Sequence, residues 1–100
     1  MNAKQEFIAH TKGKKIKCAS LSSEHYYNNK LDYGLKVNFS EPDYQDFLKQ
    51  LDFNYDSGYG GQELYGIIWY EDGTWSSRGE YDGSEWWEYN ECPSVSAKCL

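Results

Sequence analysis

The oxygen-bearing side chains between residues 52 and 63 have the spacing of a calcium loop. Loop positions 1, 3, 5 and 12 are filled by Asp52, Asn54, Asp56 and Glu63, and an EF-hand places its oxygen ligands at these positions. Position 6, however, is Ser57 instead of glycine, and a strand pattern follows where the second helix belongs. Asp, Asn and Gly also build ordinary turns. We therefore expect no cofactor, with Ca²⁺ kept as an alternative.

Acidic side chains gather near the C-terminal end, at Glu71, Asp72, Glu80, Asp82, Glu85, Glu88 and Glu91. A hydrolase with paired carboxylates needs two of them facing each other across a cleft, and no spacing in this stretch argues for that. His10 and His25 have no nucleophile at a telling spacing. We predict a non-enzymatic protein without catalytic residues, and rank an enzyme third among the hypotheses.

The three cysteines, Cys18, Cys92 and Cys99, have neither a CxxC pair nor a nearby histidine spacing that would bind zinc. Free thiols in a reducing cytoplasm are the expected state. A disulfide between Cys18 and Cys92 stays an alternative if their strands are neighbours. The sequence does not decide whether any of the three oxidises.

Charge is unevenly distributed along the 100 residues, which carry a net charge of −6. Residues 41–91 hold thirteen acidic and two basic side chains, whereas the first seventeen residues hold five lysines and one glutamate. Phosphate repels carboxylate, so the acidic part is not expected to bind nucleic acid directly; a basic protein is the favoured partner. No apolar run is long enough for a bilayer or a signal peptide. We expect a cytoplasmic protein with no membrane contact.

The stretch 62–91 positions most of these acids and all four tryptophans. Asp72-Gly73 and Asp82-Gly83 are the sequence signals of tight hairpin turns, and aromatic and β-branched runs flank them. A three-stranded meander follows. A two-residue turn at Asp72-Gly73 would pair Tyr70 with Trp75, so that Trp75 shares a face with Ile68 while Ser76, Arg78 and Glu80 lie on the face of Trp69.

The remaining elements come from the first part of the chain. Alternation predicts strands over 14–21, with Ile16 and Cys18 facing inward, and over 34–39, with a loop or irregular strand pair at 22–33. Ser40 begins a helix of about three turns, whose apolar stripe consists of Tyr44, Phe47, Leu48 and Leu51. We predict one α+β domain over 1–100, with about five antiparallel strands and one helix on one face. Residues 1–13 and 93–100 are expected to fray.

A single short helix covers only one face of such a sheet, so aromatic side chains should remain near the surface. Aromatic rings with a polar edge recur at interfaces. The predicted binding surface combines these rings with neighbouring carboxylates, at Trp69, Tyr70, Asp72, Trp75, Glu80, Asp82, Glu85, Trp86, Trp87 and Glu88. Of the adjacent pair Trp86 and Trp87, only one can point into the core.

The run GYGGQELYGIIWYEDGTWSSRGEYDGSEWWEYNECP (58–93) resembles a segment of small uncharacterised bacteriophage and prophage accessory proteins. The resemblance implies a host-cytoplasmic setting and no particular catalytic residue. Our leading hypothesis is an inhibitor that binds a basic host protein of defence or nucleic-acid processing through an acidic, aromatic surface. The alternatives are a module that stacks a sugar or nucleotide on Trp and Tyr, and the Ca²⁺ loop. The target and the oligomeric state do not follow from the sequence.

Overall fold

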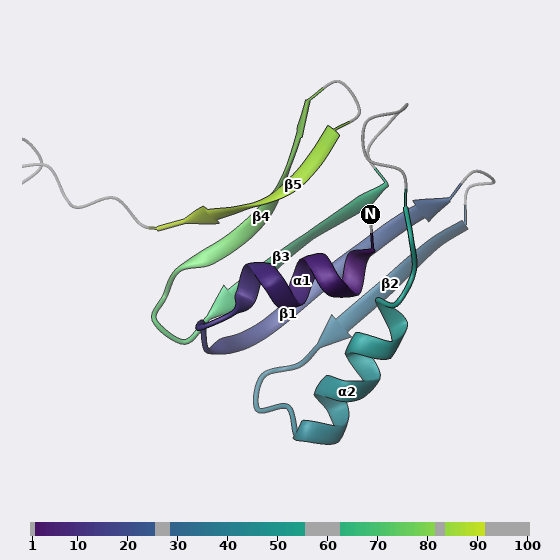
Figure 1. The fold of residues 1–100 in the computed structure, drawn as a ribbon. Helices are drawn as coiled ribbons and strands as arrows, with labels where there is room; N and C mark the ends of the chain where they lie inside the picture. Colours follow the sequence, from purple (N-terminus) through teal and green to yellow (C-terminus); the bar gives the residue numbers. More distant parts are fainter. Residues whose placement is uncertain (1, 26–28, 56–62, 82–83, 92–100) are drawn as a thin grey trace, which may run out of the picture.

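A computed structural model of the chain describes residues 2–25, 29–55, 63–81 and 84–91. Its elements are α1 (Ala3–Thr11), β1 (Ile16–His25), β2 (Asn29–Leu35), α2 (Glu41–Gln50), β3 (Leu64–Tyr70), β4 (Trp75–Tyr81) and β5 (Ser84–Asn90). The strands form one antiparallel sheet in the order β2-β1-β3-β4-β5 (Figure 1). The predicted α+β fold and its C-terminal meander are thus confirmed.

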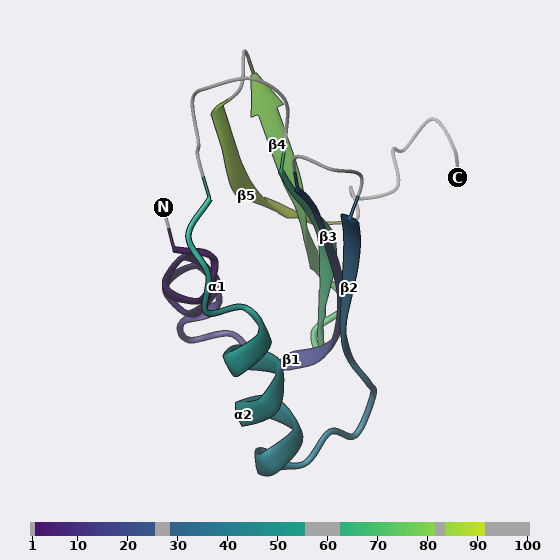
Figure 2. The same ribbon diagram turned by 90° about the vertical axis from the view of Figure 1, so that its right-hand side faces the viewer.

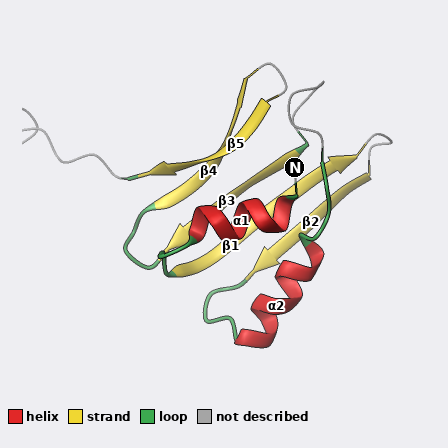
Figure 3. Ribbon diagram, in the orientation of Figure 1, coloured by secondary structure: helices red, strands yellow, loops and turns green. Residues whose placement is uncertain are grey.

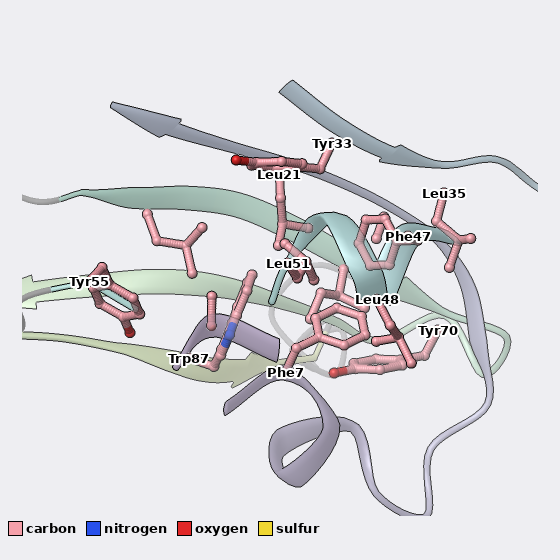
Figure 4. Close-up of a cluster of buried hydrophobic side chains, with 14 residues drawn as sticks. Phe7, Leu21, Tyr33, Leu35, Phe47, Leu48, Leu51, Tyr55, Tyr70 and Trp87 are labelled. Carbon is pink, nitrogen blue, oxygen red and sulfur yellow. The ribbon is translucent and has the colours of Figure 1, made fainter. Parts of the chain in front are cut away.

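Both helices pack on the same face of this sheet, and within the described residues no helix lies on the other (Figures 2 and 3). The core fills the space between the helices and the sheet, where Phe7, Phe47, Leu48, Tyr70 and Trp87 meet (Figure 4). The Phe7 ring contacts Phe47 edge-on, with centroids 5.3 Å apart. We call the sheet face toward the helices the covered face and its opposite the open face.

Helix α1 was not predicted, because residues 1–13 were expected to fray. Its sequence has a weak apolar stripe, and its stability comes from two tertiary anchors. The side chain of Phe7 is fully buried, and the backbone N–H of Ala3 donates to the carbonyl of Phe53 at 3.0 Å. Asn2 caps the helix by accepting from the backbone N–H of Gln5. Packing, more than local propensity, decides whether such a short helix forms.

Helix α2 follows its sequence signals closely. Ser40 and Asp43 form a reciprocal capping box, and Pro42 lies in the first turn. The helix ends at Gln50, and Phe47, Leu48 and Leu51 are buried against the sheet. Local capping and apolar spacing were therefore enough to predict it.

Strands β1 and β2 differ from the predicted ones. β1 runs on to His25 and β2 begins at Asn29, so of the two alternatives predicted for 22–33, a loop or a strand pair, the structure has the strand pair. A bulge lies between Ile16 and Cys18, and it changes which side chains point inward. Ala19 is buried, whereas Cys18 pairs with the open-face residue Trp69. The predicted inward orientation of Cys18 was wrong.

The hairpin between β3 and β4 is one residue out of the predicted register. The backbone N–H of Tyr70 donates to Thr74 at 3.0 Å, and Trp69 pairs with Trp75. The turn therefore has three residues, and Asp72 stabilises it by accepting from the backbone N–H of Thr74. A shift of one residue moves every β4 side chain to the other face. Trp75 thus lies on the open face, and Arg78 on the covered one.

Candidate functional site

The strand pairing forms two neighbouring rows of side chains across the open face, and one of them contains Trp69 and Trp75. Partners in antiparallel strands project to the same side of a sheet. One row joins Cys18, Trp69, Trp75 and Asn90, and the next joins Ser20, Ile67, Ser77 and Glu88. Trp86 lies beside them, opposite Gly79. Ile67, Trp69 and Trp86 are 38%, 39% and 39% exposed, and both helices lie on the other face of the sheet (Figure 2).

The indole of Trp86 has a fixed position on this face. A Cβ atom placed on Gly79 would lie 2.6 Å from the indole Nε1, so the ring lies against the glycine backbone. The Nε1–H also donates to Oε1 of Glu88 at 2.8 Å. Because Gly79 has no side chain, the ring can pack against its backbone, and the hydrogen bond to Glu88 orients it. Less conformational entropy is therefore lost when a partner contacts the ring.

The pairing register places the carboxylate residues Glu88 and Asp32 on this face. Glu88 lies in the second of these rows, and Asp32 of β2 pairs with Ser22 toward the opposite edge. Lys17 lies in the bulge and has no pairing partner of its own. The open face therefore combines exposed indoles with negative charge, and both attract a cation.

The structure separates the ten predicted binding residues into several locations. Trp69, Trp75, Trp86 and Glu88 come together on the open face. Tyr70, Glu85 and Trp87 are buried on the covered face instead. Asp72 lies in the β3–β4 turn, where its carboxylate is 3.5 Å from the ammonium of Lys14. Glu80 is exposed and pairs with Glu85 in register, and Asp82 lies outside the described residues.

A buried ionic cluster, which the sequence did not reveal, occupies the covered face. The side chain of Arg78 is only 1% exposed, and its guanidinium lies 2.7 Å from the carboxylate of Glu6 and 2.6 Å from that of Glu85. It also donates to the Tyr55 hydroxyl at 3.0 Å, and its Cζ lies 5.0 Å from the centre of a ring of Trp87. We call Arg78, Glu6, Glu85 and Tyr55 the Arg78 cluster.

The Arg78 cluster ties separate parts of the chain to the sheet. Glu6 belongs to α1, Tyr55 follows α2, and Glu85 accepts from the backbone N–H groups of Glu63 and Leu64 at 2.8 and 2.9 Å. Burial opposes the charge on Arg78, but the hydrogen bond with Glu85 and the charge of Glu6 outweigh it and raise the pKa of the guanidinium. The cluster is thus a structural support of the fold, with its charges satisfied internally.

A second polar cluster joins α1 to β4 and β5. His10 Nε2 is hydrogen-bonded to Ser76 Oγ at 2.7 Å, which is also 2.7 Å from the hydroxyl of Tyr70. The His10 ring stacks on Tyr89 with centroids 4.0 Å apart, and the Tyr89 hydroxyl donates to the carbonyl of His10. Histidine beside serine can activate a nucleophile, but Ser76 is 0% exposed. This contact therefore holds α1 against the sheet.

The predicted calcium loop is described only in part. The oxygens Asp52 Oδ1 and Asn54 Oδ1 accept from the side-chain amide of Asn2 at 3.1 and 3.2 Å. The backbone N–H of Glu63 donates to Glu85, and Asp56 lies outside the described residues. Among the residues that the structure describes, no three His, Cys, Asp or Glu side chains are grouped as a metal site would require.

Comparison with known proteins found no matching family model, no similar curated protein and no similar solved structure. Within the described ranges, neither helix has the length and apolar character needed to cross a bilayer. The class to which the chain belongs is therefore defined by its architecture: an antiparallel α+β sheet covered by helices on one face.

Proposed function

We propose that this chain is a non-enzymatic binding protein that docks a basic segment of another protein onto the open face of its sheet. The observation that carries the proposal is the group of indoles left exposed there, Trp69 and Trp86, beside the partly exposed Trp75. Tryptophan is enriched among the residues that dominate binding energy at interfaces. An exposed apolar sheet face with polar neighbours is typical of a protein-binding surface.

The chemistry of the partner follows from charge. The chain carries a net charge of −6, and Glu88 and Asp32 lie on the open face. Arginine and lysine bind both to carboxylates and to the faces of indole rings. We therefore expect a partner segment with exposed arginine or lysine next to apolar side chains. Inhibition of a host protein is the biological role proposed here, and the resemblance to phage accessory proteins supports it only through the host-cell setting that it implies.

The test is affinity capture from a bacterial host lysate with three matched baits. The wild type is compared with the open-face variant Trp69→Ser/Trp86→Ser and with the control Ile8→Ser/Val37→Ser, which changes two exposed apolar residues elsewhere. We expect the wild type and the control to retain the same basic protein at low salt, and the open-face variant to lose it. Retention by all three baits would contradict the proposal, as would a captured partner without basic character.

A sugar-stacking or nucleotide-stacking module is the second candidate, and the fixed indole of Trp86 favours it. A rigid ring beside a carboxylate can bind a sugar by stacking and hydrogen bonding. Titration with sugars and nucleotides while tryptophan fluorescence is recorded separates the two functions. Protein docking on the open face predicts no saturable change that depends on Trp86, whereas a saturable change that Trp86→Ser abolishes would favour the stacking module.

A further inference from the structure

A cavity of about 420 Å³ lies where the start of β1, the loop after β2 and the start of α2 meet. Its size is in the range of small-molecule sites. The aromatic part of its wall comes from the loop and α2 and is separate from the indoles of the open face. The lining residues that matter here are Lys14, Lys15, Lys17, Phe39, Tyr44 and Glu71, together with Glu41.

The lysines give one side of this cavity positive charge. Lys14 is engaged elsewhere: its ammonium is 3.5 Å from Asp72 and lies over the rings of Tyr70 and Tyr89. Lys15 and Lys17 have no ion pair or side-chain hydrogen bond with any residue in the described ranges. Two ammonium groups at the rim of a concavity raise the local concentration of anions.

A pair of aromatic side chains forms another part of the cavity wall. The rings of Phe39 and Tyr44 are stacked with centroids 5.9 Å apart and an interplanar angle of 26°. Both are partly buried and pack against the core, which fixes their positions. Asn38, with a φ of 64°, forms the left-handed turn that brings Phe39 to this place. An outer ring face of this fixed pair can therefore stack a planar ring without rearrangement.

The carboxylates of Glu41 and Glu71 also line the cavity and disfavour a simple anion. A ligand that fits all three features has an anionic group for the lysines, a planar ring for the wall and hydrogen-bond donors for the carboxylates. We propose that this cavity binds a nucleoside monophosphate, with the phosphate at Lys15 and Lys17 and the base on Phe39 and Tyr44. This site is independent of the proposed docking on the open face.

The test is an NMR titration of the full chain at low ionic strength with three probes: adenosine 5′-monophosphate, adenosine and inorganic phosphate. We expect the nucleotide to bind saturably and more tightly than either fragment, with amide shifts concentrated at residues 15–17 and 38–41. Absence of saturation, equal affinity for phosphate alone, or shifts centred on the open face would overturn the proposal.

Charge variants give the second measurement. Lys15→Ala/Lys17→Ala should weaken nucleotide binding by at least about tenfold, because ion contacts to phosphate are lost. The control Lys12→Ala/Lys49→Ala removes the same charge from exposed positions outside the cavity and should change the affinity much less. Equal losses in the two variants would mean that only net charge matters and would overturn the site. Since all of these lysines are exposed, circular dichroism should show both variants folded.

Discussion

Arg78 explains the register of β4. With Ser76 and Arg78 on the covered face, the guanidinium reaches Glu6 and Glu85 and the Ser76 hydroxyl reaches His10 and Tyr70. The predicted two-residue turn would have turned both side chains to the other face. An arginine in an aromatic strand gives no sequence signal of inward orientation, because arginine is rarely buried without partners. Those partners are distant in sequence, so the cluster was not predictable.

Replacing Arg78 by methionine should lower the free energy of unfolding by about 3–5 kcal/mol, because two buried carboxylates would lose their cation. Urea unfolding measures the change. Lys49→Met, the same substitution at an exposed position of α2, should alter stability by less than about 0.5 kcal/mol. Adding Glu6→Gln to Arg78→Met should restore part of the loss. Similar values for Arg78→Met and Lys49→Met would contradict the role of the cluster.

His10 should make stability depend on pH. Burial, and secondly the charge of Arg78, lower the pKa of His10 below its ordinary value of 6.5, and Lys14 lies over the Tyr89 ring on which His10 stacks. The folded state then binds a proton less readily than the unfolded chain. The contribution of His10 to the free energy of unfolding is fully present above pH 6.5. It is lost as the pH falls through the pKa that His10 has in the folded state.

The free energy of unfolding of the wild type is therefore expected to decrease between about pH 7 and pH 5. His10→Gln keeps a polar partner for Ser76 but does not titrate, and it should have a smaller slope in this window. The carboxyls with lowered pKa, Asp43 and Asp72, act separately at lower pH, below their ordinary value of 3.8. Equal slopes for the wild type and His10→Gln would show that His10 is not involved.

At the scale of elements, those that depend on local sequence signals could be predicted, and those that depend on tertiary contacts could not. Helix α2 was predictable because its cap and its apolar stripe lie within its own sequence. Helix α1 was missed because its stability depends on Phe7 and on the bond from Ala3 to Phe53. The β3–β4 pairing was predicted, but its register was not, since Asp-Gly serves both two-residue and three-residue hairpin loops.

Gly66 tests the close packing of β1 on β3. Its φ is 156°, and a Cβ there would lie 2.8 Å from the backbone oxygen of Ser20 and 2.9 Å from Cα of Leu21. Backbone atoms cannot move aside easily, so Gly66→Ala should cost about 1–3 kcal/mol. Gly34→Ala in β2 is the control, because a Cβ there meets nothing within 4 Å, and it should be nearly neutral. Equal decreases in the denaturant midpoints of the two variants would contradict this close packing.

For the whole molecule, the main consequence of the fold is that its helices cover one face of the sheet. The sequence indicated that one face of the sheet would remain uncovered, and it placed tryptophans near that face. It did not indicate which ones, because the face of Trp75 depended on the hairpin register and the orientations of Trp86 and Trp87 on the strand pairing. The structure assigns Trp69, Trp75 and Trp86 to the open face and Trp87 to the core.

Docking on the open face requires its indoles to be accessible in solution while the core indole is not. Acrylamide quenching of proteins that keep a single tryptophan, with the other three replaced by phenylalanine, measures this directly. We predict efficient quenching of Trp69 and Trp86 and strong protection of Trp87, which is 7% exposed. Equal protection of all three indoles would mean that the open face is covered, and it would contradict the proposed binding surface.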